Sequence, residues 1–520
     1  MAAFGAIVMG GGHNGLVAAC YLAKAGLRVL VVERRPVLGG ACTTEELWPG
    51  VRINRLAYAY SLFRPEIVKE LELERHGLAI LTPEVDVAVP LGKGRHLLLY
   101  SDPAKTAKEI AKFSARDARA WEDYRRFWRE AGQLFGAMML APPPSLRELA
   151  ALLEEASASE LAKRLLFYSA KELLDEFFEA EEVKAALMAR GIIGTMAGPS
   201  TPGTAFVLGY HVMGEAAGEQ GAWGYVKGGM GSLALALASA LRELGGSIMT
   251  GIAVRRILIS QGRAMGVELE DGRRLEARLI LSNADPKTTL LRLVGEEHLS
   301  PELARRLRSI KDEGCVAKLN GLLRGLPRFR DLEGASAACL QGIIGIGPSW
   351  EYYERAYFEA LMGGFSSRPI ERAVFHTVLD PSLAPPGYHT LSIFSQYFPY
   401  SLKRGWEAAR QEAAEAVLGA LEEFAPGLRG LLERYELLTP LDMEREFSLP
   451  RGNIFHAELI PSQMLALRPL PELSGYRTPI GSLYLCGSAL HPGGGVTGAP
   501  GYVCAQQALK DLRGTSAARP

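Results

Sequence analysis

Three glycines near the start of the chain have the types and spacing needed to hold a nucleotide. Gly10, Gly12 and Gly15 form the pattern G-x-G-x-x-G within GGGHNG, and Asn14 lies inside it. In such a turn the first glycine permits a tight bend, the second lets backbone approach a pyrophosphate, and the third lets a helix lie close to a strand. Glu33 follows at a distance where a carboxylate can accept both ribose hydroxyls and repel a 2′-phosphate. This pattern predicts binding of FAD or NAD rather than NADP.

A strand, a helix and a second strand must position that turn. Ala6–Met9 are apolar without alternation, which is typical of a strand buried on both faces of a parallel sheet. Asn14–Ala25 reads as a helix that Gly26 ends, and Arg28–Val32 reads as the next strand, with Glu33 at its end. The turn, the helix and the carboxylate are therefore in the register that dinucleotide binding requires.

A second glycine pair distinguishes between the two nucleotides. The stretch ERRPVLGGACTT places Arg34 beside the glutamate and Gly39 and Gly40 shortly after. It resembles the E-R-x-x-x-x-G-G signature of the flavoprotein superfamily that contains amine oxidases and phytoene desaturases. The resemblance implies FAD as the cofactor, with the second glycine pair near the flavin side of the pyrophosphate.

Two later segments resemble the remaining parts of such a cofactor domain. In the first, a glycine-rich turn and an amphipathic helix precede a strand around 252–257 and a hairpin at Asp271–Gly272. The resemblance implies that Val254 contacts the adenine through its backbone. In the second, a strand over Leu483–Cys486 ends at Gly487, and we expect a helix to begin near Val496.

The N-terminus of that last helix carries free N–H groups and partial positive charge, which suit the edge of a flavin that becomes negative on reduction. We therefore expect Gly487, Gly495 and Val496 to contact the flavin. The stretch Gly493 to Gly498 is also formally G-x-G-x-x-G, but no strand precedes it directly. It does not predict a nicotinamide site.

Nearly the whole chain resembles the phytoene desaturase-like flavoprotein family. That resemblance implies an α/β fold with a Rossmann-like FAD-binding domain of the glutathione reductase and amine oxidase type, a mixed α+β substrate domain and a helical lobe. We expect the FAD-binding domain to be discontinuous, over 1–75, 225–295 and 445–520. Residues 76–224 are then the helical lobe and part of the substrate domain, and 296–444 its sheet and helices. One motif departs from the family, because Thr497 stands where carotenoid desaturases usually have proline. That difference argues against a carotenoid substrate.

Candidate catalytic residues are few. No Ser-His-Asp order, H-E-x-x-H motif, metal-ligand cluster or paired carboxylates stand out, and a flavin can perform oxidations with the protein supplying orientation and electrostatics. Lys227, before the central glycine turn, and His491, before the last helix, are the residues we consider. A surface lysine and a histidine bonded to a loop carbonyl are the structural alternatives.

Composition excludes several other classes. Lys+Arg and Asp+Glu both number 58 in 520 residues, which argues against nucleic-acid binding. The six cysteines include no C-x-x-C pair, so neither a disulfide framework nor a redox dithiol is indicated. We find no signal peptide, and glycine and proline interrupt the long uncharged stretches. We expect a cytoplasmic protein, with peripheral membrane contact through an apolar loop at Phe135–Pro144 as an open alternative.

The leading functional prediction is an FAD-dependent oxidoreductase, a desaturase, dehydrogenase or isomerase, acting on a lipophilic substrate of isoprenoid or carotenoid-like type. An amine oxidase-like flavoenzyme and an FAD-stabilised non-catalytic partner protein are the alternatives. No cluster of arginines in the sequence suggests an anionic substrate. We expect an apolar tunnel lined by parts of 135–140, 165–168, 206–210 and 394–400. Electron acceptor and oligomeric state stay open.

Overall fold

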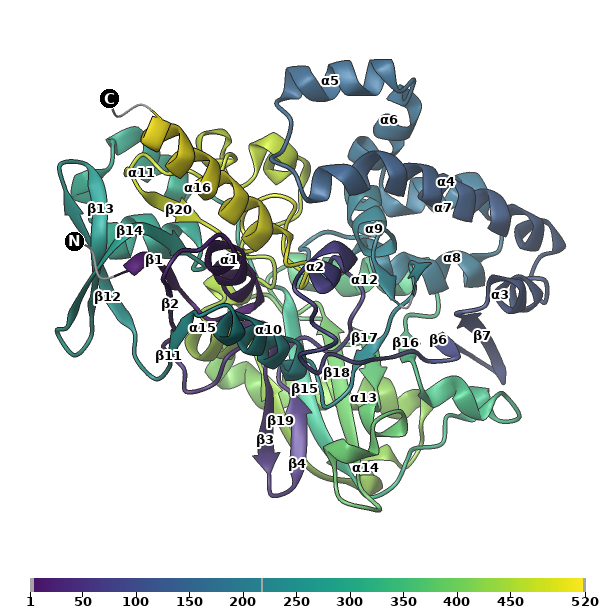
Figure 1. The fold of residues 1–520 in the computed structure, drawn as a ribbon. Helices are drawn as coiled ribbons and strands as arrows, with labels where there is room; N and C mark the ends of the chain where they lie inside the picture. The colour runs from purple at the N-terminus through teal and green to yellow at the C-terminus, as the bar shows by residue number, and fades with distance from the viewer. Residues whose placement is uncertain (1–3, 217, 518–520) are drawn as a thin grey trace.

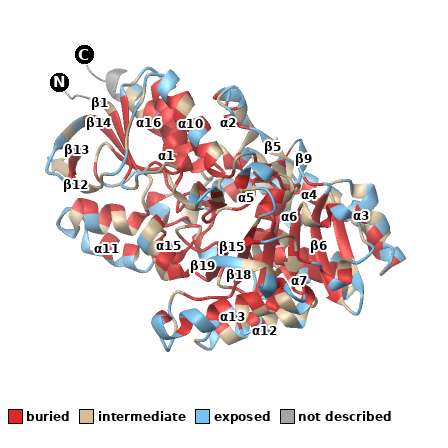
Figure 2. Ribbon diagram, turned by 90° about the horizontal axis from the view of Figure 1, so that it is seen from below, coloured by how far each residue is buried: buried red, intermediate tan, exposed pale blue. Residues whose placement is uncertain are grey.

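The computed structural model describes residues 4–216 and 218–517, with two large β-sheets and a lobe of helices (Figure 1). Strands and core helices are largely buried, and exposed residues gather at loops and on outer helix faces (Figure 2).

The first sheet takes its strands from three distant parts of the chain. Its order is β11-β2-β1-β14-β13-β12, and β20 pairs with β14. β1 is parallel to β2 and to β14, whereas β12, β13 and β14 form an antiparallel meander. The strands are β1 (Phe4–Met9), β2 (Val29–Val32), β11 (Ser247–Met249), β12 (Val254–Ser260), β13 (Arg263–Leu269), β14 (Arg274–Ser282) and β20 (Leu483–Leu485).

Three helices share a core with this sheet: α1 (His13–Lys24), α10 (Gly231–Glu243) and α16 (Ala499–Ala517). α1 lies between the other two, as Figure 1 shows. α1 and α16 approach so closely that a β carbon on Gly501 would lie 2.1 Å from the carbonyl oxygen of Asn14. α16 begins at Ala499, not near Val496 as the sequence suggested, because the backbone at Val496 has a φ of +65°, outside the helical region.

The second sheet has the order β19-β15-β18-β17-β16-β6-β7. Its pairs are antiparallel except for β16 and β6. α13 (Trp406–Phe424) packs against one face, and the opposite face turns towards the helical lobe. The strands are β6 (Val85–Gly92), β7 (Arg95–Tyr100), β15 (Val316–Leu323), β16 (Ile343–Ile346), β17 (Ile370–Val374), β18 (His389–Gln396) and β19 (Leu432–Leu438).

The helical lobe stands beside the second sheet, with α5 and α6 projecting furthest in Figure 1. Its helices are α3 (Pro103–Ile110), α4 (Ala115–Met139), α5 (Leu146–Glu155), α6 (Ser159–Phe167), α7 (Ala170–Phe177), α8 (Glu181–Met188) and α9 (Thr204–Val212). The prediction of an exposed apolar loop from Phe135 is wrong for its first part. Phe135, Met138 and Met139 lie in the last turn of α4 and are buried.

Smaller elements connect these parts. They are β3 (Thr44–Trp48) with β4 (Val51–Asn54), β5 (Ile80–Leu81) with β10 (Tyr225–Val226), β8 (Glu215–Ala216) with β9 (Glu219–Gln220), and the helices α2 (Pro65–Glu70), α11 (Pro301–Arg308), α12 (Trp350–Leu361), α14 (Leu428–Leu431) and α15 (Pro440–Phe447). In the part of the chain that the structure describes, no helix combines the length and apolar character needed to cross a bilayer. Peripheral membrane contact stays a prediction.

Candidate active site

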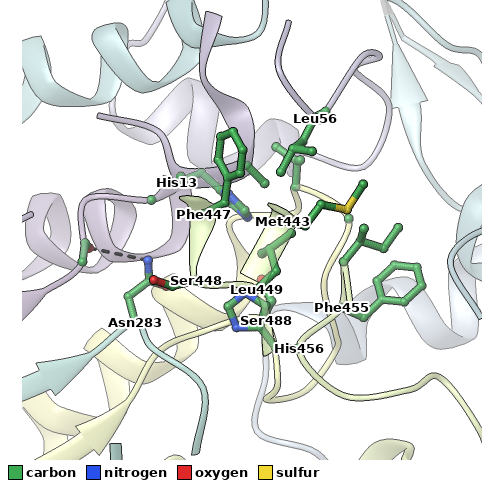
Figure 3. A pocket seen from close by; sticks show the side chains of 18 of the residues that line it. His13, Leu56, Asn283, Met443, Phe447, Ser448, Leu449, Phe455, His456 and Ser488 are labelled. Carbon is green, nitrogen blue, oxygen red and sulfur yellow. Dashed lines mark hydrogen bonds between the residues drawn. The ribbon is translucent and has the colours of Figure 1, made fainter. Parts of the chain in front are cut away.

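A pocket of about 270 Å³ lies between the two sheets and is lined by residues of both. Figure 3 shows part of its wall, with Phe447 and Met443 of α15 and the segment around Phe455 enclosing it. We divide the lining residues into three groups. The nucleotide end has Gly10, Gly12, Glu33, Arg34 and Val254, the middle has Gly40, Ala41, Ser61, Leu62, Gly495 and Val496, and the remaining part has Tyr58, Ile193, His211, Trp223, Lys318 and Phe394.

The two glycine segments form a cradle without side chains. Gly10, Gly39 and Gly40 have φ angles of +98°, +117° and +57°, a region that favours glycine. Gly39 N donates to Gly11 O at 2.9 Å, and a β carbon on Gly40 would lie 3.3 Å from the α carbon of Gly12. α1 starts beside this cradle with no side-chain cap, so its first N–H groups have no side-chain acceptor. Such a helix start binds anionic groups such as a pyrophosphate.

Glu33, directly after β2, is held by two backbone N–H groups. Its Oε2 atom accepts from Gly11 N at 2.7 Å and its Oε1 atom accepts from Arg35 N at 2.8 Å. Each carboxylate oxygen keeps a second lone pair. Glu33 lines the pocket, so these lone pairs can accept ribose hydroxyls. Arg34 also lines it, and its guanidinium donates to the carbonyl oxygens of Arg445 and Glu446 at 2.9 and 2.7 Å.

The other predicted nucleotide residues divide into two kinds. Gly495, Val496 and Val254 line the pocket. Gly15 and Gly487 are packing glycines outside its lining: their β carbons would lie 2.1 Å from Gly10 O and 2.7 Å from Asn283 O. Gly39 does not line the pocket, but its N–H group donates to Gly11 O and so joins the two glycine segments.

Asn14 is buried next to the cradle. Its Nδ2 atom donates to Ser488 Oγ at 3.1 Å, while its Oδ1 atom has no partner within the described residues. The Nε2 atom of His13, which lines the pocket, is also buried without a partner. The carboxamide of Asn283 points back towards Gly10, with Nδ2 3.5 Å from its carbonyl oxygen (Figure 3). The glycine cradle, the uncapped helix and these unpaired polar atoms fit a bound dinucleotide.

Neither predicted catalytic residue reaches the pocket. The Lys227 side chain is exposed, and its backbone N–H donates to Ala79 O at 2.9 Å. His491 is buried, and its Nε2 atom lies 2.9 Å from Met138 O. Burial lowers the pKa of His491 to about 4, so it is neutral at ordinary pH. The placement of both residues therefore matches the structural alternatives, a surface lysine and a histidine bonded to a loop carbonyl.

A different lysine lines the pocket. Lys318 of β15 is 1% exposed, and its Nζ atom donates to Asn320 Oδ1 at 2.8 Å and to Ser392 Oγ. Burial lowers its pKa from 10.5 to about 7. It is therefore poised to exchange a proton near neutral pH. The sequence held a signal, because a lone charge interrupts the otherwise uncharged strand VAKLNGLL.

Aromatic rings from both parts of the structure surround the region near Lys318. Tyr58 lies 5.5 Å from Phe394 and 6.4 Å from Trp223, measured between ring centroids, and His211 stacks on Trp223 at 6.4 Å. Burial lowers the pKa of His211 to about 4, so it too is neutral. We call Tyr58, Ile193, His211, Trp223, Lys318 and Phe394 the aromatic chamber.

The structure corrects the lining of the predicted tunnel. Of the stretches 135–140, 165–168, 206–210 and 394–400, only Phe394 lines the pocket. The inference about arginines is also corrected by the structure. Arg190 and Arg372, far apart in sequence, lie over the same ring of Trp223, with guanidinium carbons 5.7 and 4.8 Å from its centroid.

The fold and the pocket define an FAD-binding oxidoreductase. The chain belongs to the family of flavin-containing amine oxidoreductases, whose pattern matches residues 15–500. Its cofactor is FAD, as the resemblance implied.

Three curated relatives match over nearly their full lengths. Mouse pyridine nucleotide-disulfide oxidoreductase domain-containing protein 2 is 38% identical over 98% of this chain and 94% of its own. A limonene dehydrogenase subunit of Castellaniella defragrans is 29% identical over 97% and 94%. A lycopene-forming phytoene desaturase of Pseudescherichia vulneris is 25% identical over 97% and 98%. The predicted family resemblance is thus confirmed, with phytoene desaturases at lower identity.

Among solved structures, an oxidoreductase from Methanosarcina mazei matches with a TM-score of 0.63 at 20% identity, covering 97% of this chain and 99% of its own. The predicted fold class is confirmed by this likeness.

Proposed function

We propose that this oxidoreductase removes hydrogen from adjacent carbon atoms of a substrate with a lipophilic body, and that the aromatic chamber holds that body. The observation that carries the proposal is the combination of Lys318 with apolar and aromatic walls at one end of the FAD pocket.

Two groups would share the chemistry. FAD, when bound, supplies the acceptor for a hydride, which is a hydrogen nucleus with two electrons. This hydride leaves one C–H bond of the substrate. The neutral amine of Lys318 accepts the proton that leaves the neighbouring carbon, whose electron pair becomes the second bond of a C=C group. Asn320 and Ser392, which accept hydrogen bonds from Lys318, hold its Nζ atom in place. The chamber walls exclude water from this exchange.

The charges near the chamber disfavour an amine that enters as a cation. Glu33, at the nucleotide end, is the one carboxylate among the residues that line the pocket within the described chain. Near the aromatic rings the cationic groups are Arg190 and Arg372, with Lys318 when it is protonated. A protonated amine would therefore lose its hydration without gaining an ionic partner.

The names of two relatives support a lipophilic substrate. Limonene and phytoene, which appear in them, are hydrocarbons. Thr497 still distinguishes this chain from the usual carotenoid desaturase motif, so we favour a shorter substrate than a carotenoid.

Anaerobic reduction of the bound flavin, followed by its visible absorbance, tests the proposal. The probes are limonene and oleate, offered in detergent, against putrescine and benzylamine as cationic substrates. We expect bleaching by an apolar probe and none by the amines. Rapid bleaching by an amine alone would overturn the proposal in favour of an amine oxidase, and bleaching by no probe would favour a non-catalytic FAD protein. Lys69→Met, an exposed control on α2, should behave as the parent chain does, whereas Lys318→Met should slow the reaction.

A further inference from the structure

Arg372 of β17 is a buried cation with an unused hydrogen-bond donor. It is 4% exposed, and its Nε atom donates to the hydroxyl of Tyr58 at 3.0 Å. Its Nη2 atom is buried and has no partner in the described chain. A buried guanidinium normally has all its donors paired, because an unpaired donor there loses its hydration without replacement.

Arg190, which follows α8, adds a second cation at the same place. The two guanidinium groups contact one indole ring, that of Trp223. Burial is the main cause that lowers the pKa of Arg190, and the positive charge of Arg372 lowers it further. No carboxylate of the described residues lies within 4.0 Å of either guanidinium. Two like charges are thus held together, and neither has an ion-pair partner among the described residues.

The acidic residues nearby neutralise this pair only in part. Asp86 accepts a hydrogen bond from Ser101, and burial raises its pKa to about 6, so it stays largely ionised at neutral pH and its charge acts on Arg190. Glu371 precedes Arg372 in β17, so it points to the opposite face of the sheet. Burial there raises the pKa of Glu371 well above its ordinary value.

Other charged groups around the chamber leave the same excess. Lys318 lies 5.8 Å from the ring centroid of Tyr58 and adds a further positive charge when it is protonated. Glu436, whose charge acts on Lys318, is paired with Arg55 at 3.0 Å. The chamber therefore has a positive end that the nearby carboxylates compensate only in part.

Arg372 borders a hollow that adjoins the chamber. The hollow has a volume of about 10 Å³ and is lined by Arg372, Gln396, Ile193 and Phe394, among others. Ile193 and Phe394 also line the main pocket, so the two spaces share these two residues. A volume of this size holds about one water-sized atom, such as one carboxylate oxygen.

We propose that Arg372, supported by Arg190 across the indole of Trp223, binds a carboxylate of the substrate, whose apolar body lies in the aromatic chamber. This inference rests on the proposed function and narrows its substrate class to lipophilic carboxylic acids. A planar guanidinium with free N–H groups matches the geometry of a carboxylate.

The test compares three probes that differ only in the head group: decanoate, decanamide and decylamine. Binding to the FAD-loaded protein is measured by the change in flavin absorbance and by the shift in thermal unfolding. We expect decanoate to bind at least about tenfold more tightly than decanamide, as a charge-assisted hydrogen bond would provide, and decylamine to bind most weakly. Equal affinities for decanoate and decanamide would overturn the proposal.

Variants connect the preference to the two arginines. Arg372→Gln and Arg190→Gln should each remove most of the preference for decanoate. Arg368→Gln, an exposed residue paired with Glu423, should keep it. Without ligand, Arg372→Gln should unfold at the same temperature or higher, because it removes an unpaired buried charge. Should that variant fail to fold, the result for Arg190→Gln decides. A preference that survives it would refute the carboxylate site.

The experiments distinguish failure of the carboxylate site from failure of the proposed function. A protein that limonene reduces but that shows no preference for decanoate would refute only the carboxylate site. A protein that amines alone reduce would refute the proposed function itself.

Discussion

The carbonyl oxygen of Gly10 lies against the α carbon of Gly15, so that a β carbon at Gly15 would come within 2.1 Å of it. At Gly12 a β carbon would meet the Nδ2 atom of Asn283, at 2.8 Å. The first obstacle is backbone, and the second is the end of a side chain that can rotate. The two glycines of one motif therefore have different physical roles.

We expect Gly15→Ala to lower the free energy of unfolding by about 1–3 kcal/mol or more, through overpacking between β1 and α1. Gly12→Ala should leave that free energy nearly unchanged but weaken FAD binding, because the methyl group enters the cradle. Urea unfolding of the apoprotein and titration with FAD measure the two effects. Equal effects of both substitutions on unfolding would contradict this division.

Glu33 should determine ribose affinity. Glu33→Gln replaces one of the two oxygens that accept backbone N–H groups with an amide donor. The lost charged acceptor should weaken FAD binding by about 1.5–3 kcal/mol. Glu276→Gln, at an exposed position of β14, is the matched control and should bind FAD normally. An unchanged affinity in Glu33→Gln would mean that the ribose lies elsewhere.

Lys318 should make stability depend on pH in the neutral to alkaline range. Its folded pKa of about 7 lies below the ordinary 10.5, so between these values the unfolded chain binds the proton and the folded chain does not. Unfolding then takes up a proton, and the free energy of unfolding rises with pH. From pH 7 to 9 we expect the parent chain to gain about 2 kcal/mol relative to Lys318→Met. Urea denaturation at several pH values measures this difference, and Lys69→Met should show none.

Five histidines with lowered pKa values should make the protein sensitive to acid. Burial lowers the pKa of one to about 3 and of the others to about 4, and they are His13, His211, His376, His456 and His491. Below pH 6.5 the unfolded chain binds protons that the folded chain excludes. Each histidine therefore lowers the free energy of unfolding by up to about 1.4 kcal/mol per pH unit as pH falls towards 4.

His456→Asn isolates one of these contributions. The backbone at His456 has a φ of +61°, which asparagine tolerates. Between pH 6.5 and 4.5 the variant should lose stability less steeply than the parent chain, by one proton. His298→Asn changes an exposed histidine and serves as the control. Identical slopes in the parent chain and in His456→Asn would show that His456 is protonated in the folded state.

The sequence by itself determined the nucleotide end of the pocket. Gly10, Gly12 and Glu33 belong to one continuous strand-turn-helix-strand unit, and the spacing of that unit along the chain fixes where each residue lies. Local patterning also gave α1 and β2 to within one residue, and it gave the end of β1 at Met9, although β1 begins at Phe4, two residues before the predicted start. It placed the start of α16 too early, because Val496 and Gly498 have φ angles of +65° and +72°, outside the helical region.

The tertiary structure alone decided the substrate end. Lys318 and Arg372 lie on strands of a sheet whose order is not the order of the chain, and Trp223 comes from the connection between β9 and β10. No spacing in the sequence relates these residues. The sequence therefore offered Lys227 and His491 as catalytic candidates, and Lys318 was not among them. Arg190 and Arg372 illustrate the reason: each is an isolated arginine in sequence. Packing of the helical lobe against the second sheet brings both onto one indole ring, and this long-range contact, unlike a turn, leaves no local signature.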